Sequence, residues 1–572
     1  MTQVRLAEPR RTVQAQFPDG RTFEGPVGTT LEAFVRAAYP DPTVPPMAAI
    51  VDGELRELAV PVRRDVEVKP VFLTDSDGIR IYTRSLSFLL TACFRELFPE
   101  AKLIIDHSVP FGGYYCRVTG RSPLSGEELG RLEEHMRQLV REDRPILREQ
   151  VSIEEARAWF DAHGKPHKAA LLAQGAEDGH LHLYRLGDFR DYFFGYMVPS
   201  TGYLPYFALT PYHDGFILRF PRRERPTELA PPEDYSALWQ VFVEYREWLE
   251  LLGVYDAWTV NEAIRTGRIR EVILVSEALH EQRIVQIARA IAELPPDRRR
   301  LVLIAGPSSS GKTTFTKRLA VQLIAQGLRP YPVSLDDYFL PREEMRRRGL
   351  TDFDDISALD LPLLARHMEE LLSGKRVTLP HYNFRTGERE EGPTLKLARD
   401  EMLLAEGIHA LNPALLPQDV GEHAFHIYVS ALTQLNLDSS VRLHTTDTRL
   451  LRRIVRDAAF RGYSAEDTLR LWPNVRRGEK RHIFPYQGKA DVMFNSALVY
   501  EWAVLRPRAE PLLLQVRDRR LRIEAERLLA TLRWISPYEG KEIPATSILR
   551  EFIGGGILRA YYPTPLERSV GR

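Results

Sequence analysis

Hydrophobic and polar positions change their period several times along the chain, and each change marks a predicted element. Apolar residues alternate with polar ones over 13–17, which is typical of a strand, and Asp19-Gly20 favours a hairpin turn after it. An amphipathic helical stretch follows Thr29-Thr30, and the alternation resumes over 66–71. These patterns predict a small β-rich module with one helix over 11–73.

A second region, 74–222, contains both helix-like and strand-like patterns of apolar residues. A charged, helix-like pattern covers 126–141, and strand-like stretches lie at 181–185 and 216–220. This mixture predicts an α+β fold.

A proline-rich and charged stretch then interrupts the apolar pattern, so 223–235 is predicted to be a linker. Helical spacing of large apolar residues over 236–294 predicts a helical connector. The continuous apolar run 301–305 is typical of a strand buried on both faces, and we expect an α/β domain with a parallel sheet over 295–500. A helical extension, 501–572, completes a multi-domain α/β and α+β chain.

Composition narrows the functional classes. At 572 residues the chain is too long for one core. It has 78 Lys and Arg against 78 Asp and Glu, so no global positive field favours nucleic acid. Cys93 and Cys116 lack the spacing of a zinc site, and no apolar run reaches the roughly 18 residues that span a bilayer. We expect a cytoplasmic protein with no membrane partner, and homo-oligomer formation stays open.

A glycine-rich loop follows the strand at 301–305 directly and precedes a helical pattern. Its residues are Gly306, Pro307, Ser308, Ser309, Ser310, Gly311, Lys312 and Thr313, with Thr314 after them. Strand, loop and helix in this order predict a phosphate-binding loop whose helix N-terminus faces the phosphates. Lys312 would reach the β- and γ-phosphates and Thr313 would ligate Mg²⁺, so ATP and Mg²⁺ are the expected cofactors. The loop alone does not separate a kinase from a hydrolase, a motor or a GTPase.

Two carboxylates follow later strand-like runs. Asp336 comes at the end of the run 331–335, and Glu406 comes after 402–405. Ligands bind at the carboxyl ends of strands in open α/β sheets, so Asp336 is a candidate base and Glu406 a candidate metal-side acid. Helix capping by an Asp pair is the alternative for Asp336.

Four arginines recur at helical spacing: Arg449, Arg452, Arg453 and Arg456. At i, i+3, i+4 and i+7 they share one helix face. Such a stripe favours an anion opposite it, such as a transferring phosphoryl group. The alternative is a solvated basic face that Asp447 and Asp457 partly neutralise.

The order of these blocks resembles the uridine kinase / phosphoribulokinase family. Further blocks that carry the resemblance are Phe353-Asp354, Pro380-His381-Tyr382-Asn383-Phe384 and Ala490-Asp491-Val492. The resemblance implies a kinase that phosphorylates a small alcohol. It assigns catalysis to Asp336, Lys312, Arg449 and Arg453, metal binding to Thr313, Glu406 and Asp336, nucleotide binding to the loop with Arg452 and Arg456, and substrate binding to Phe353, Asp354, Tyr382 and Phe384.

This sequence departs from the family's pattern at two places that affect the prediction of the phosphate acceptor. The family's Tyr-Asp-Phe-x-x-His block appears as 382–387 without its histidine, and only Phe353-Asp354 remains of a Phe-Asp-His-Pro-Asp block. A nucleoside of the uridine or cytidine kind and another small alcohol both stay open as acceptors.

The front half resembles the first two domains of threonyl-tRNA synthetase, a TGS-like module over 11–73 and an editing-type domain over 74–222. The supporting residues include the blocks 183–189 and 198–202. The positions that match the family's hydrolytic His and Cys ligands are Arg84, Phe88, Phe193 and Met197, so we expect neither catalytic zinc nor deacylation. Ligand sensing, RNA or tRNA contact with the nucleotide domain as an ATPase switch, and a packing role stay open.

Two other features are given structural interpretations. His163, His167, His180 and His182 are expected to be ordinary surface or loop histidines. Gly554-Gly555-Gly556 is expected to be a turn, because no apolar strand precedes it.

Overall fold

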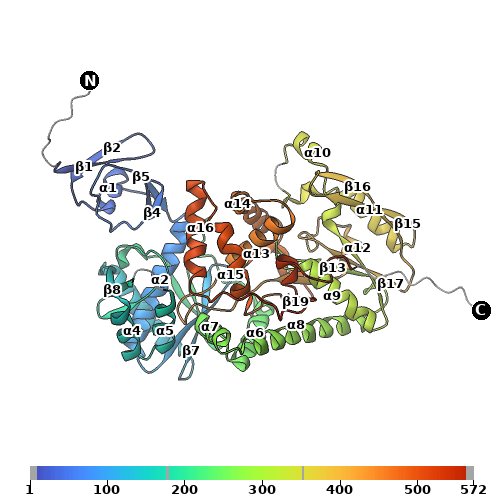
Figure 1. Ribbon diagram of the computed structural model, residues 1–572, viewed down its shortest axis with the longest axis horizontal. Coiled ribbons are helices and arrows are strands. Elements are labelled where there is room, and N and C mark those ends of the chain that lie inside the picture. The colour runs from blue at the N-terminus through green and yellow to red at the C-terminus, as the bar shows by residue number, and fades with distance from the viewer. Residues whose placement is uncertain (1–9, 176–178, 351–352, 562–572) are drawn as a thin grey trace, which may run out of the picture.

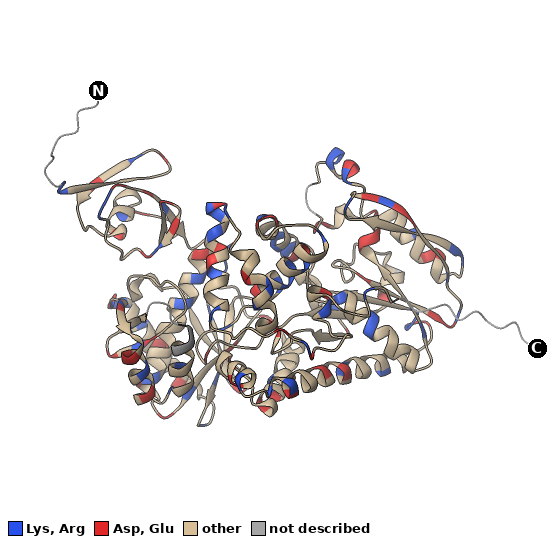
Figure 2. Cartoon of the chain, in the orientation of Figure 1, with Lys and Arg blue, Asp and Glu red and all other residues tan. Residues whose placement is uncertain are grey.

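The computed structural model describes residues 10–175, 179–350 and 353–561 (Figure 1). The end of the predicted C-terminal extension, 562–572, lies outside the described residues. Within the described chain, no helix combines the length and the apolar character needed to cross a membrane. Both the basic and the acidic residues are spread over the two halves of the chain (Figure 2).

The N-terminal module is a five-stranded sheet with one helix. Its first two strands form the predicted hairpin, and the last strand pairs parallel with the first. Thr30 caps the helix by accepting a hydrogen bond from the N–H of Ala33. The sheet order is β2-β1-β5-β3-β4, with β1 (Thr12–Gln16), β2 (Thr22–Pro26), α1 (Leu31–Ala38), β3 (Pro46–Val51), β4 (Glu54–Arg56) and β5 (Val66–Phe72).

The next region packs a long helix against antiparallel strands. The helix α2 (Ser76–Leu97) is buried along most of its length, and α3 (Gly126–Arg141) has the predicted bounds, with a capping box between Ser125 and Glu128. The sheets are β11-β12-β7-β6 and β10-β9-β8. The strands are β6 (Lys102–Ser108), β7 (Gly113–Thr119), β8 (Leu147–Ser152), β9 (His180–Leu186), β10 (Phe189–Asp191), β11 (Ala208–Tyr212) and β12 (Gly215–Arg219), with helices α4 (Ile153–Ala162) and α5 (Pro166–Gly175) between β8 and β9.

Residues 220–235, all of them described, form no helix or extended strand. The segment is nevertheless docked, because Arg223 donates to Ser76 Oγ at 2.7 Å and the Tyr235 ring stacks on Tyr212 at 4.7 Å. Three helices follow: α6 (Ser236–Leu252), α7 (Ala257–Arg265) and α8 (Ile269–Ala292).

A parallel five-stranded sheet forms the centre of the second half. Its order is β14-β17-β13-β18-β19, and every neighbouring pair is parallel. This confirms the predicted fold class, in which a parallel α/β sheet follows antiparallel α+β regions. The strands are β13 (Leu301–Ala305), β14 (Arg329–Ser334), β17 (Glu401–Glu406), β18 (Phe425–Ser430) and β19 (Val492–Asn495), and β15 (Arg376–Asn383) and β16 (Glu388–Lys396) form a separate hairpin.

Helices complete this half and connect it to the front. The helix α16 (Arg519–Leu532) lies beside α2 (Figure 1), and Arg80 of α2 pairs with Glu524 of α16 at 2.7 Å. The other helices are α9 (Lys312–Ala325), α10 (Arg342–Arg347), α11 (Leu361–Leu372), α12 (Gln418–Glu422), α13 (Thr445–Phe460), α14 (Ala465–His482), α15 (Glu501–Leu513) and α17 (Arg550–Ile553).

Apolar clusters cross the predicted segment boundaries. One cluster joins Phe111 and Ile217 of the front half to Leu303 of the central sheet. Another joins Phe160 to Ile284 and Phe315. The predicted division of the chain into six segments, which include the linker 223–235 and the helical connector 236–294, stays a prediction.

Candidate active site

The glycine-rich loop connects β13 to α9 at the carboxyl edge of the parallel sheet. Gly306 has no room for a side chain, since a Cβ would lie 2.0 Å from the carbonyl oxygen of Val429. Gly311 has φ +86° and precedes α9 directly. The chain therefore needs glycine at both ends of the loop, and the first N–H groups of α9 face a cavity of about 460 Å³.

Three predicted residues meet where the loop faces strand β17. Thr313 Oγ1 donates to the Glu406 carboxylate at 3.0 Å, and Lys312 lines the same cavity. Burial raises the pKa of Glu406 to about 7, and burial also lowers the pKa of Lys312. Lys312 and Glu406 partly compensate each other's charge, and together they offer a buried ammonium for an anion and a buried carboxylate for a cation.

The structure distinguishes the two neighbouring aspartates after β14. Asp337 accepts the N–H of Tyr382 at 3.0 Å and lies 3.1 Å from the His381 ring, so it holds strand β15. Asp336 lines the cavity instead. Of the pair, Asp336 is the carboxylate placed to meet a substrate.

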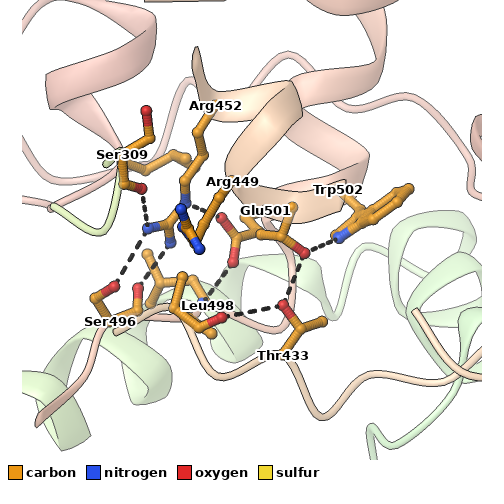
Figure 3. A network of polar contacts seen from close by, with 12 residues as sticks. Ser309, Thr433, Arg449, Arg452, Ser496, Leu498, Glu501 and Trp502 are labelled. Carbon is orange, nitrogen blue, oxygen red and sulfur yellow. Dashed lines mark hydrogen bonds and ion pairs between the residues drawn. The ribbon is translucent and has the colours of Figure 1, made fainter. Parts of the chain in front are cut away.

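The arginine stripe on α13 divides into two pairs. Arg449 Nε donates to the Ser308 carbonyl at 2.9 Å and its guanidinium pairs with buried Glu479. Arg452 Nε pairs with Glu501 at 2.6 Å and its other nitrogens reach Ser496, as Figure 3 shows. Both side chains lie behind the loop and do not line the cavity, so the predicted phosphate-facing roles of Arg449 and Arg452 are revised to support of the loop backbone.

The second pair faces the cavity. Arg453 Nη1 donates to Ser308 Oγ at 2.8 Å, and Arg453 and Arg456 share the carboxylate of Asp457. Arg461, which the sequence did not single out, joins them, and its proximity to Arg456 lowers its pKa to about 10. Three guanidinium groups with one carboxylate leave an excess of positive charge for an anionic ligand.

Aromatic residues line one side of the cavity. Phe353, Asp354 and Phe384 line it, and Arg461 lies over the Phe384 ring at 5.0 Å. Tyr382 is 1% exposed and packs behind Phe384 with ring centroids 5.0 Å apart. The structure therefore brings three of the four predicted substrate residues to the cavity and places Tyr382 as their support.

The C-terminal extension forms a wall that sequence reasoning missed. Glu551 of α17 accepts from the N–H and the hydroxyl of Thr314 at 3.1 and 2.9 Å. Arg550 and Arg559 also line the cavity, as do Gly554, Gly555 and Gly556. The glycine run with flanking arginines was the available signal, although its distance from the loop in sequence gave no reason to join them.

The oxygen-bearing side chains in the cavity suit a Mg²⁺ ion that takes its remaining ligands from a substrate and water. Among the residues that the structure describes, no group of three or more His, Cys, Asp or Glu is placed to hold a metal ion. Mg²⁺ commonly takes one or two protein carboxylates and completes its shell with phosphate oxygens and water. Thr313 and Glu406, with Asp336 across the cavity, are such a set.

The positions that match the synthetase's hydrolytic site are apolar or cationic here. Phe88 and Phe193 pack at 5.3 Å, and Met197 is buried beside them. Arg84 donates to the Tyr196 carbonyl at 2.7 Å. Of these four positions, none carries a metal-ligating side chain of the zinc type.

The phosphate-binding loop, the carboxylates Asp336 and Glu406 and the arginine helix α13 all lie within one stretch of the chain, residues 301–500. Residues 301–500 match the sequence profile of the Phosphoribulokinase / Uridine kinase family. The solved structure described as a possible uridine kinase from Bacillus stearothermophilus aligns with 37% of this chain and 98% of its own, at 19% identity and a TM-score of 0.27.

The N-terminal region matches threonine–tRNA ligases. The ligase of Symbiobacterium thermophilum is 32% identical over 197 residues, which are 34% of this chain and 30% of the ligase. That of Halorhodospira halophila is 36% identical over 264 residues, 46% of this chain and 39% of the ligase. The chain thus spans about a third of the length of these relatives, and both resemblances predicted from sequence are confirmed.

Proposed function

We propose that this protein transfers the γ-phosphate of ATP to a hydroxyl group of a nucleoside-like alcohol. One observation carries the proposal: Lys312, Thr313, Glu406 and Asp336 line a single cavity at the carboxyl edge of a parallel sheet. Phosphoryl transfer depends mainly on positioning and charge stabilisation, and these groups supply both.

Each residue has a distinct role in this proposal. The N–H groups at the start of α9 and Lys312 hold the phosphates, and Arg453 and Arg456 stabilise the charge of the transferring group. Asp336 accepts the proton of the attacking hydroxyl, the oxygen of that hydroxyl forms a bond to the γ-phosphorus, and the bond from the γ-phosphorus to ADP breaks as ADP leaves. Thr313 and Glu406 would hold Mg²⁺, and the ion would neutralise negative charge that develops on the phosphates.

The acceptor is proposed from the aromatic wall of the cavity. Phe353 and Phe384 offer rings on which a flat base packs, and Asp354 offers a carboxylate for sugar hydroxyls. A nucleoside such as uridine or cytidine satisfies both. The missing histidine near Phe384 keeps other small alcohols as alternatives.

An acceptor screen tests the proposal. The full chain is incubated with Mg²⁺-ATP and, in turn, uridine, cytidine, other nucleosides, pantothenate, ribulose 5-phosphate and glycerate, and ADP release is measured. Release above the ATPase background with a nucleoside, and none in Lys312→Ala, is expected. Release only with a non-nucleoside alcohol contradicts the substrate class, and no acceptor-dependent release with any alcohol contradicts the kinase.

RNA binding by the N-terminal region is a second candidate. The similarity of that region to enzymes named threonine–tRNA ligases supports it. Filter binding of tRNA at 50 and 200 mM salt tests it, because phosphate contacts weaken steeply as salt rises. Absence of binding at 50 mM salt contradicts this candidate.

A further inference from the structure

A second cavity, of about 450 Å³, lies between the front half and the helices of the second half. None of its lining residues belongs to the phosphate loop. It is bounded by α2, by residues 192–196, by residues 437–447 around the start of α13, and by α16. Tyr192, Phe194 and Trp534 form an aromatic wall, with ring centroids 4.7 to 5.3 Å apart. Such an apolar, concave site with a few charged groups is typical of small-molecule binding.

Three arginines that line this cavity differ in whether an acidic side chain pairs with them. Arg80 pairs with Asp77 and Glu524, and Arg527 makes two 2.7 Å contacts with Asp447. Arg84 has one hydrogen bond, to a carbonyl, and no Asp or Glu of the described chain lies within ion-pair distance of it. A largely buried guanidinium without a carboxylate is unfavourable unless an anion joins it.

A glycine at position 195 leaves room for the Arg84 guanidinium. Gly195 has φ +131°, and a Cβ there would lie 2.7 to 2.9 Å from the three guanidinium atoms nearest to it. Only glycine therefore admits the guanidinium against this peptide, where Arg84 reaches the Tyr196 carbonyl. The contact fixes one edge of the guanidinium and leaves the other donors to the cavity.

We propose that this cavity binds a small molecule that carries one carboxylate or phosphate group on an apolar body. The anion pairs with Arg84, as guanidinium groups do with both oxyanions, and the body packs on the Tyr192, Phe194 and Trp534 rings. The site is independent of the kinase proposal, because none of its residues lines the phosphate-loop cavity.

Three probes of one size test the site on the full chain. Benzoate, phenyl phosphate and the neutral amide benzamide are compared by saturation-transfer NMR, each in the presence of saturating ADP. At least one anion is expected to bind tenfold or more tightly than benzamide, and which anion does so distinguishes a carboxylate ligand from a phosphate ligand. Equal binding of benzamide, or no binding of either anion at 5 mM, overturns the proposal.

Two variants locate the bound anion. Arg84→Gln should remove the preference for the anion, and Arg84→Lys should keep part of it. Ala530→Phe, on the exposed face of α16 that lines the cavity, should block all three probes without depending on Arg84. Arg131→Gln, which changes an exposed arginine of α3 that lines neither cavity, is the matched control and should leave benzoate binding unchanged. Undiminished anion binding in both Arg84→Gln and Ala530→Phe places the site elsewhere and overturns the proposal.

Discussion

Glu551 contacts the phosphate loop at an N–H group that is suited to bind a phosphate. Its carboxylate accepts from the N–H of Thr314, one of the N–H groups that open helix α9. Such groups bind anions because they have no partner within the helix and lie at the positive end of its dipole. We infer that Glu551 would compete with a nucleotide phosphate for this N–H group.

We predict that Glu551→Gln binds ADP more tightly. A neutral amide keeps the size of the side chain and removes its repulsion of the phosphates, and a gain of about tenfold corresponds to roughly 1.4 kcal/mol. Isothermal titration calorimetry measures it. Glu539→Gln, on an exposed part of the same extension, is the control and should bind as the native chain does. Unchanged or weaker binding in Glu551→Gln contradicts the competition.

At the scale of elements, helix α14 packs against the cavity wall formed by Phe353, Asp354 and Phe384, which is the wall proposed to bind the phosphate acceptor. A Cβ on Gly478 would lie 2.5 Å from the Asp354 Cβ and 2.9 Å from its carbonyl oxygen. The close approach of helix and wall thus depends on glycine at this point. The same helix supplies Glu479, which pairs with Arg449 behind the phosphate loop.

We predict that Gly478→Ala acts on the acceptor and spares the nucleotide. The added methyl group pushes residue 354 out of place, so the KM of the acceptor should rise about tenfold or more while the Kd of ADP stays within threefold. Steady-state kinetics and calorimetry measure the two quantities. Gly488→Ala, where a methyl group meets nothing within 4 Å, is the control. An unchanged KM in Gly478→Ala contradicts the assignment of this wall.

The sequence predicted some elements well and others poorly, for physical reasons. The strand Leu301–Ala305 and the helix Gly126–Arg141 have the predicted bounds because a continuous apolar run and a capping box are local signals. Helix α2 was not predicted, although Ile79, Tyr82, Leu86 and Leu89 recur in it at helical spacing, so a local signal was present and was not used.

The site shows the same division between local and long-range signals. The loop, Asp336 and Glu406 follow predicted strands and meet in the cavity. The buried partners of Arg449 and Arg452 are Glu479 and Glu501, which are distant in sequence, so helical spacing alone gave no way to separate these arginines from Arg453 and Arg456. Glu551 reaches the loop only through tertiary packing.

At the scale of the whole molecule, the front half is interlocked with the segment that leads into α13. Asn436 donates to the Ile105 carbonyl at 3.0 Å, and Arg442 donates to the Asp106 carbonyl at 2.7 Å. Buried Lys168 bridges Asp191 and Asp438 at 2.5 and 2.6 Å. The arginine helix is thus held from the front half as well as from the central sheet, and the two halves form one packed unit.

We predict that the stability of this unit depends on pH because two of its histidines are buried. Burial lowers the pKa of His280 and of His409 to about 3, whereas both titrate near 6.5 when unfolded. As pH falls below about 6.5, the unfolded chain binds protons that the folded chain does not. The free energy of unfolding should therefore fall, by at most about 3 kcal/mol per pH unit from the two groups.

Urea unfolding between pH 7.5 and 5.5 measures this slope. His280→Gln removes one of the two groups and should reduce the slope by about half of their joint contribution. A free energy of unfolding that stays constant over this range contradicts the assignment of both histidines as neutral in the folded chain.

The central claim is that Asp336 accepts a proton from a hydroxyl while the phosphate loop holds ATP, and single-turnover phosphoryl transfer tests it most directly. With the acceptor found in the screen, Asp336→Asn should lower the transfer rate by a factor of about 10² to 10⁴ and leave the Kd of ATP within threefold. Asp337→Asn, which alters the neighbour that holds β15, should weaken folding and keep most of the transfer rate of the folded fraction. A native transfer rate in Asp336→Asn, or an equal loss in both variants, would contradict the account.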